Sequence, residues 1–63
     1  MDNLEYIAIC FKYNGDPYPR RYHIRGSKIN SFNGFLAREG YIYWNRYNKA
    51  SGAFIDRIWV DLM

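Results

Sequence analysis

Alternating apolar and polar residues in the first 25 positions predict two strands joined by a turn. Residues 4–13 (LEYIAICFKY) alternate with the period of two that a strand requires. Asn14-Gly15 follows, and this pair is the strongest short signal for a hairpin because both residues tolerate a positive φ. Pro19 lacks an N–H donor for a sheet ladder, which favours the start of an edge strand. Residues 20–25 (RRYHIR) alternate again and predict that second strand.

The spacing of apolar residues then changes from two to three and four, which predicts a helix. The apolar stripe consists of Ile29, Phe32, Phe35 and Leu36. Ser27 or Ser31 is expected to cap its start by accepting a hydrogen bond from a free backbone N–H. Gly34 lowers the stability of a helix, so a late start at Ser31 is an alternative. Gly40 is placed to end the helix in a left-handed conformation.

Two further strands are predicted after the helix. Residues 41–47 (YIYWNRY) are dense in aromatic side chains, residues 48–52 form a polar turn, and residues 53–62 alternate. The predicted order is ββαββ, an α+β fold with a four-stranded, largely antiparallel sheet and one helix packed on one face. The length of 63 residues predicts a single domain over residues 1–63.

One helix can cover only one face of such a sheet, so the other face is expected to be open. The more apolar sides of the strands are expected under the helix: Ile7, Ile9, Phe11, Tyr22, Ile24, Ile58 and Val60. The opposite sides then carry Tyr6, Arg21, His23, Arg25, Arg57 and Trp59. The third strand adds either Tyr41, Tyr43 and Tyr47 or Ile42, Trp44 and Arg46, and its aromatic residues on both sides leave the register open.

An exposed sheet face rich in Tyr, Trp and Arg is typical of an interaction site. We therefore predict a binding surface made of Tyr6, Arg21, His23, Arg25, Tyr43, Trp44, Arg46, Arg57 and Trp59. Such a face serves either a foreign partner or a second copy of the chain. The alternative is a tightly curled sheet whose aromatic side chains cover one another.

Residues with catalytic or metal-binding chemistry are few. Cys10 is the only cysteine and His23 the only histidine, so the chain offers no zinc ligand set and no internal disulfide, and we expect no cofactor. Cys10 and His23 lie on adjacent predicted strands, but the apolar neighbours of Cys10 favour a buried, structural thiol. The six carboxylates are scattered, and no glycine-rich phosphate loop occurs. We therefore expect no enzyme.

The formal net charge of +3 permits a nucleic-acid partner without requiring one. Residues 18–25 and 44–49 interleave aromatic and cationic side chains, a composition that suits stacking on bases and contact with phosphates. The sequence motif of the common RNA-recognition sheet is absent. Direct nucleic-acid binding is therefore kept as the alternative function.

The main expectation is a small adaptor or inhibitor that docks on a protein or nucleoprotein partner. The first residues lack the basic region of a signal peptide and no apolar run is long enough for a membrane span, so a cytoplasmic, intracellular location without a membrane partner is expected. Small domains often gain stability by association, which leaves a homodimer open. The length also fits viral accessory proteins.

Overall fold

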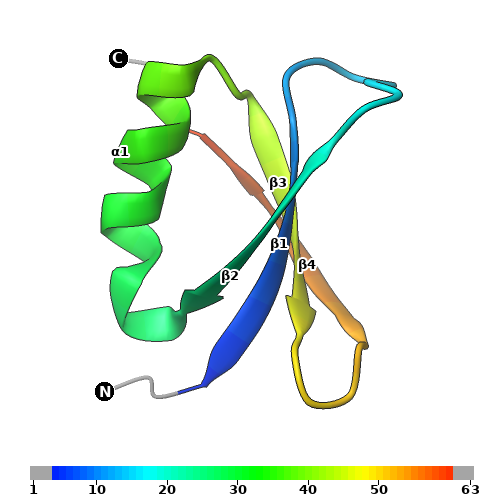
Figure 1. Cartoon of the computed structure of the whole chain (residues 1–63), viewed down its shortest axis with the longest axis vertical. Coiled ribbons are helices and arrows are strands. Elements are labelled where there is room, and N and C mark those ends of the chain that lie inside the picture. The colour runs from blue at the N-terminus through cyan, green and yellow to red at the C-terminus, as the bar shows by residue number, and fades with distance from the viewer. Residues whose placement is uncertain (1–3, 61–63) are drawn as a thin grey trace.

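The computed structural model describes residues 4–60 and contains four strands and one α-helix, in the predicted ββαββ order (Figure 1). The elements are β1 (Glu5–Phe11), β2 (Arg20–Arg25), a 3-10 turn η1 (Gly26–Lys28), α1 (Ile29–Glu39), β3 (Tyr43–Asn48) and β4 (Phe54–Trp59). The prediction of an α+β fold is confirmed. Within the described residues, no helix has the length and hydropathy of a membrane span.

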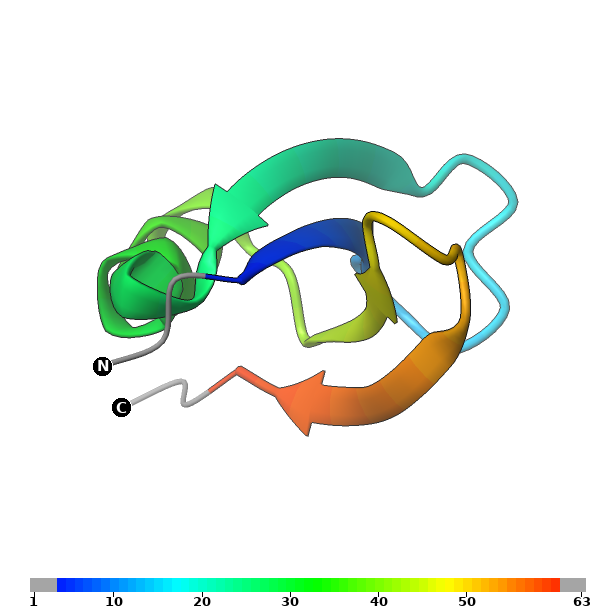
Figure 2. The same cartoon turned by 90° about the horizontal axis from the view of Figure 1, so that it is seen from below.

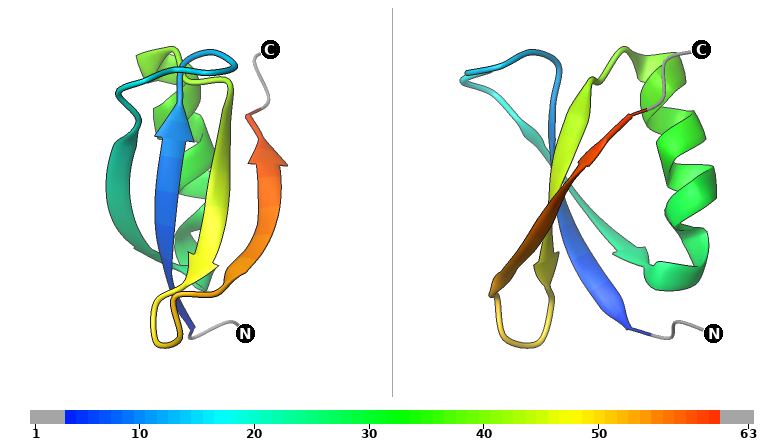
Figure 3. Two further views of the ribbon diagram at one scale, coloured as in Figure 1. Left: turned by 90° about the vertical axis from the view of Figure 1, so that its right-hand side faces the viewer. Right: turned by 180° about the vertical axis from the view of Figure 1, so that it is seen from behind.

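The four strands form one antiparallel sheet in the order β2-β1-β3-β4. The central pair, β1 and β3, is distant in sequence, and each central strand also pairs with its own hairpin partner at an edge. α1 lies against one face, and the opposite face looks toward the viewer in the left panel of Figure 3. Seen from below, both edge strands curve toward the helix (Figure 2), so the sheet is strongly twisted.

Both hairpin loops reach out on the side of the sheet away from α1 (Figure 1). In the β1–β2 loop, Gly15 has a φ of 84° and the Asp16 carboxylate accepts backbone N–H bonds from Lys12 and Tyr18. In the β3–β4 turn, the side-chain oxygen of Asn48 accepts two backbone N–H bonds in the same manner. These turn residues hold the loops beyond the helix-free face.

The predicted end of α1 agrees with the structure, but its predicted start does not. Neither Ser27 nor Ser31 caps the helix, because η1 leads directly into it and α1 already begins at Ile29, so both the predicted serine cap and the alternative start are wrong. The end is as predicted: Gly40 has a φ of 88°, and its N–H bonds back to carbonyl oxygens of the last turn.

The hydrophobic core lies between α1 and the sheet and centres on Trp44. Its buried members are Ala8, Cys10, Phe32, Leu36, Tyr41, Trp44 and Val60. The Trp44 ring meets Phe32 edge-on at a centroid distance of 5.1 Å, and its indole N–H donates to Asn33 Oδ1 over 2.9 Å. The predicted apolar stripe of the helix is confirmed, since Ile29 and Phe35 also pack against this core.

β1 presents the opposite side to the helix from the one predicted. Ala8 and Cys10 are fully buried under α1, whereas Ile7, Ile9 and Phe11 point to the other face and are half-buried. The physical reason is space: α1 brings Phe32 and Phe35, and β3 brings Trp44, so the central strand beneath these rings carries small side chains. Large rings and small side chains together fill the layer at the density of a protein interior.

Candidate functional site

The helix-free side of the sheet is the candidate functional surface, and we call it the open face. Within residues 4–60 no helix or strand covers it (Figure 3, left panel). Strand alternation and register give its members: Ile7, Ile9 and Phe11 from β1, Arg21, His23 and Arg25 from β2, Tyr43, Asn45 and Tyr47 from β3, and Phe54, Arg57 and Trp59 from β4.

Six of the nine residues predicted for binding lie on the open face: Arg21, His23, Arg25, Tyr43, Arg57 and Trp59. The other three, Tyr6, Trp44 and Arg46, lie on the helix-covered face. Tyr6 is only 5% exposed and Trp44 is 0% exposed, so neither side chain is available to a partner in this structure.

Arg46 is held on the covered face by its own partners. Its Nε and Nη2 donate to both carboxylate oxygens of Asp56, over 3.0 and 2.8 Å. Its guanidinium also lies 4.7 Å from the centroid of the Tyr6 ring. A two-pronged pair of this kind fixes the side chain, so the predicted placement of Arg46 on the open face is wrong.

Three aromatic rings form a row across one end of the open face. Phe11 stacks on Tyr43 at 4.9 Å between centroids, and Trp59 contacts Tyr43 from the other side at 5.1 Å. The Arg57 guanidinium lies 4.4 Å from the centre of the Tyr43 ring and donates to Asn45 Oδ1. Tyr43 is therefore only 4% exposed, while Trp59 at the end of the row is 64% exposed.

The predicted alternative, in which the aromatic side chains cover one another, thus holds for Tyr43 but not for the whole face. Trp59 stays open at one end, and Phe54, which meets Tyr47 edge-on at 5.6 Å, is 57% exposed at the other. Exposed rings of this size forgo the favourable burial that aromatic side chains usually gain.

A hollow of about 250 Å³ lies in the middle of the open face and extends toward the β3–β4 turn. It is lined by Ile7 and Ile9 of β1, Arg21 of β2, Tyr47 of β3 and Gly52 of the turn. Gly52 has a φ of 77°, which a glycine adopts readily and other residues rarely do. The hollow therefore has an aliphatic floor, a cation at one side and a ring at the other.

The open face carries unbalanced positive charge. Among the described residues the ion pairs are Arg46–Asp56 on the covered face and Lys49–Glu5 at the corner of the open face. Lys49 hydrogen-bonds Glu5 and thereby holds the pKa of that carboxyl below its ordinary value. Arg21, Arg25 and Arg57 form no ion pair within residues 4–60. Within residues 4–60 the one carboxylate on this face, Glu5, is thus already paired, and three arginines face solvent.

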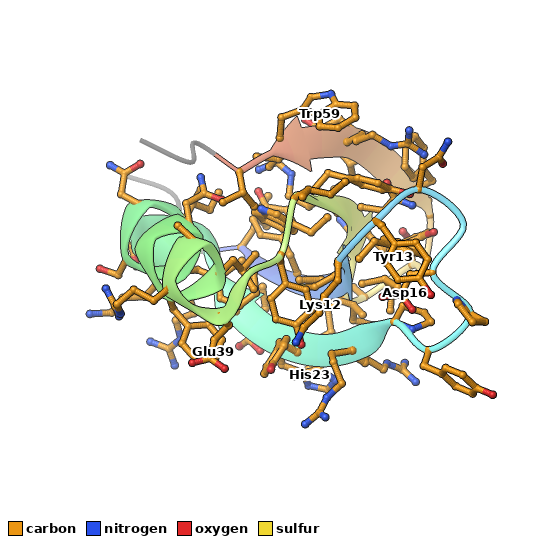
Figure 4. The ribbon with its side chains drawn as sticks, turned by 90° about the horizontal axis from the view of Figure 1, so that it is seen from above. Lys12, Tyr13, Asp16, His23, Glu39 and Trp59 are labelled. Atoms are coloured by element: carbon orange, nitrogen blue, oxygen red, sulfur yellow. The ribbon has the colours of Figure 1, made fainter. Side chains whose placement is uncertain are left out.

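The charged edges of the open face point in different directions because the sheet is twisted. Figure 4 shows Trp59 on the outer side of β4 and His23 on the outer side of β2, projecting away from each other. A small rigid ligand therefore cannot contact both edges at once. The central hollow is the place from which a partner can reach both edge strands.

The structure separates the two residues that most resembled a catalytic pair. Cys10 points under the helix and His23 lies on the open face, so the sheet itself stands between them. Burial raises the pKa of the Cys10 thiol to about 12, which keeps it protonated and a poor nucleophile. In the described part of the chain, no group of three or more His, Cys, Asp and Glu side chains is placed to hold a metal ion.

The predicted binding surface lacks Ile7, Ile9, Phe11 and Phe54, which shape the open face, and Tyr47 is predicted there only in one of the two registers of the third strand. The more apolar side of β1 predicts that Ile7, Ile9 and Phe11 lie in the core. Phe54 reaches the open face through a bulge, since Arg46 pairs with Asp56 but Tyr47 pairs with Phe54, which leaves Ile55 as the extra residue. No turn or glycine signal in 53–62 marks that bulge.

Comparison of the chain with protein-family models, with curated proteins and with solved structures finds no match.

Proposed function

We propose that this chain is a small, non-catalytic interaction protein that docks its open face on a protein or nucleoprotein partner, as an adaptor or an inhibitor. The observation that carries the proposal is the coexistence, on one helix-free face, of exposed aromatic rings, an aliphatic hollow and arginines that form no ion pair within residues 4–60. Trp, Tyr and Arg dominate the energetics of protein interfaces, especially around a central apolar pocket.

The non-catalytic part of the proposal is supported by the placement of the reactive groups. The Cys10 thiol is buried and protonated, and His23 is on the other side of the sheet. The hollow is lined by aliphatic and aromatic side chains with one arginine, and it contains no acid–base pair. These groups can hold a partner in place, but they offer no route for moving a proton or forming a bond.

Direct nucleic-acid binding is the second candidate. The observation that favours it is the row of Arg21, His23 and Arg25 along the edge strand β2 together with the exposed indole of Trp59. Cations along one edge of the face can contact phosphates, while a free aromatic ring at the other edge can stack on a base. Binding through phosphates would weaken steeply as the salt concentration rises.

The proposed function is tested by affinity capture from cells that express the gene, using three forms of the full chain. The wild type is compared with a double variant of the open face, Arg21→Glu with Trp59→Ala, and with Arg38→Glu on α1 as the charge-matched control. Components held by the wild type and by Arg38→Glu, but lost from the double variant, support the proposal. Equal capture by all three forms contradicts it.

The site of contact is then mapped on the isotope-labelled chain by NMR with the captured partner. Amide signals of the open-face strand positions are expected to shift, while those of the exposed side of α1 stay in place. Shifts confined to α1 would show that a different surface carries the interaction.

A further inference from the structure

The hollow in the open face sets the chemistry of what can be seated there. Its floor is formed by the aliphatic side chains of Ile7 and Ile9, and the Tyr47 ring closes one side. The volume of about 250 Å³ is below that of a typical small-molecule pocket but ample for one large side chain. An apolar group is favoured there, because a polar group would lose its hydration without gaining hydrogen bonds from the floor.

Positive charge borders the hollow at one side and recurs on the far edge strand. Arg21 borders the hollow directly, and in the register of the sheet Arg21, Ile9, Asn45 and Arg57 lie side by side across the four strands. Neither arginine has a carboxylate partner in residues 4–60. A partner that places acidic groups on both sides of an apolar side chain would complement this row.

A second copy of the chain is a poor occupant. Symmetric pairing of two open faces would press a surface that carries Arg21, Arg25 and Arg57 against a second surface that carries the same three cations. Like charges across an interface cost several kcal/mol. Within the described residues the only carboxylate of this face, Glu5, already binds Lys49 and does not relieve that repulsion.

Single-stranded nucleic acid fits the face less well than an acidic protein does. Tyr43, at the centre of the aromatic row, is covered by Phe11 and Arg57 and has no free ring face for a base. The cations are arginines, whereas Lys49 is occupied by Glu5. Protein–protein interfaces are enriched in arginine and aromatic residues and depleted in lysine, which matches the composition of the open face.

We propose that the open face binds an acidic protein segment, with one aliphatic or aromatic side chain of that segment seated in the hollow over Ile7 and Ile9. Carboxylates that flank this side chain pair with Arg21 on one side and Arg57 on the other. This inference rests on the proposed function and names the class of partner for the same surface.

The test begins with a library of random 12-residue peptides displayed on phage and selected on the immobilised full chain. The enriched peptides are expected to carry a net negative charge and one large apolar residue between acidic ones. A synthetic, fluorescently labelled copy of the most enriched peptide is then titrated by anisotropy against the wild type and three variants.

Arg21→Glu is expected to weaken binding of that peptide by at least about tenfold, since it turns an attractive rim charge into a repulsive one. Ile9→Asp is expected to weaken it at least as much, because it places a carboxylate in the floor of the hollow. Arg38→Glu, with the same charge change on α1, should leave the affinity within about twofold.

Two results would overturn the inference. The first is a selection that enriches no acidic peptides, or peptides whose binding is equally affected by Arg38→Glu and Arg21→Glu. The second is tighter binding of labelled (dT)12 or (rU)12 than of the peptide, with loss in Arg21→Glu; the open face would then serve nucleic acid.

Failure of the inference and failure of the proposed function remain distinguishable. If the peptide selection fails but capture from cells still depends on the open face, the partner has another chemistry and the proposed function stands. If capture is also independent of the open face, both fall.

Discussion

Two neighbouring residues of β1 offer a sharp test of the arrangement on which the open face depends. Ile9 and Cys10 are consecutive, yet they point to opposite sides of the sheet. Replacing either one by aspartate introduces the same carboxylate. Cys10→Asp places it in the core beneath α1, and Ile9→Asp places it beside the solvent-facing arginines.

The expected loss of stability in each variant follows from how deeply the replaced side chain is buried. At about 0.05–0.15 kcal/mol per residue, a chain of 63 residues has a total stability of about 3–9 kcal/mol. A carboxylate in place of fully buried Cys10 would cost several kcal/mol, which takes most or all of that stability. Ile9 is only half-buried, so its loss costs about 1 kcal/mol of burial and up to about 1 kcal/mol of strand preference. A favourable pair with Arg21, directly across on β2, offsets part of that cost.

Far-UV circular dichroism and urea unfolding measure both effects. Cys10→Asp is expected to show no cooperative transition, whereas Ile9→Asp stays folded with a urea midpoint lower by about 1–2 M, given a slope near 1 kcal/mol per M for so small a protein. Cys10→Ala controls for loss of the thiol and should fold. A folded Cys10→Asp together with an unfolded Ile9→Asp would refute the assigned face of β1 and, with it, the hollow.

Three further predictions concern the helix and the thiol. Gly34→Ala in α1 should raise the free energy of unfolding by up to about 1 kcal/mol, because the added Cβ meets only Arg38, at ordinary contact distance. Gly40→Ala should lower the free energy of unfolding by about 1–2 kcal/mol, because Gly40 has a positive φ. Urea unfolding measures both changes. Asn33→Ala should lower the free energy of unfolding by about 1–3 kcal/mol, because it leaves the Trp44 indole N–H without an acceptor. A double-mutant cycle with Trp44→Phe that shows no coupling energy would contradict this. Native Cys10 should resist iodoacetamide at pH 8. Folding raises the pKa of the Cys10 thiol from 9 to about 12, so the unfolded state loses the thiol proton at a lower pH than the native state does. The free energy of unfolding should therefore fall as the pH rises from 9 to about 12, and this fall should be smaller in Cys10→Ala.

The order of the elements and the buried stripe of α1 could be predicted because local signals agree there. The spacing of Phe32 and Leu36, the left-handed Gly40 and the alternation of β2 all point to the structure that forms. These features depend on residues close together in the chain. The helix start could not be predicted in the same way, since η1 supplies its first turn without a serine cap.

The faces of the central strands could not be predicted because both of their sides are apolar or aromatic. In β3, Trp44 goes to the core and Tyr43 to the open face, and nothing within 41–47 ranks one above the other. In β1 the more apolar side is predicted to face the helix, and this prediction is wrong. Which side faces the helix depends on the size of side chains brought by α1 and β3, which is a property of the packed layer and not of the strand.

The placement of the large apolar residues of β1 gives the strongest physical reason to expect a partner. Exchanging the two faces of β1 would put Ile7 and Ile9 under the helix, where each square ångström removed from water contributes about 25 cal/mol. The chain instead uses Ala8 and Cys10 there and leaves both isoleucines half-exposed beside Arg21. The core is complete without them, because the rings of Phe32 and Trp44 fill the layer. Within residues 4–60 no helix or strand covers the apolar area that remains on the open face, so a partner that binds there would remove it from water. Arg21 and Arg57, which form no ion pair in this part of the chain, favour a partner that carries negative charge.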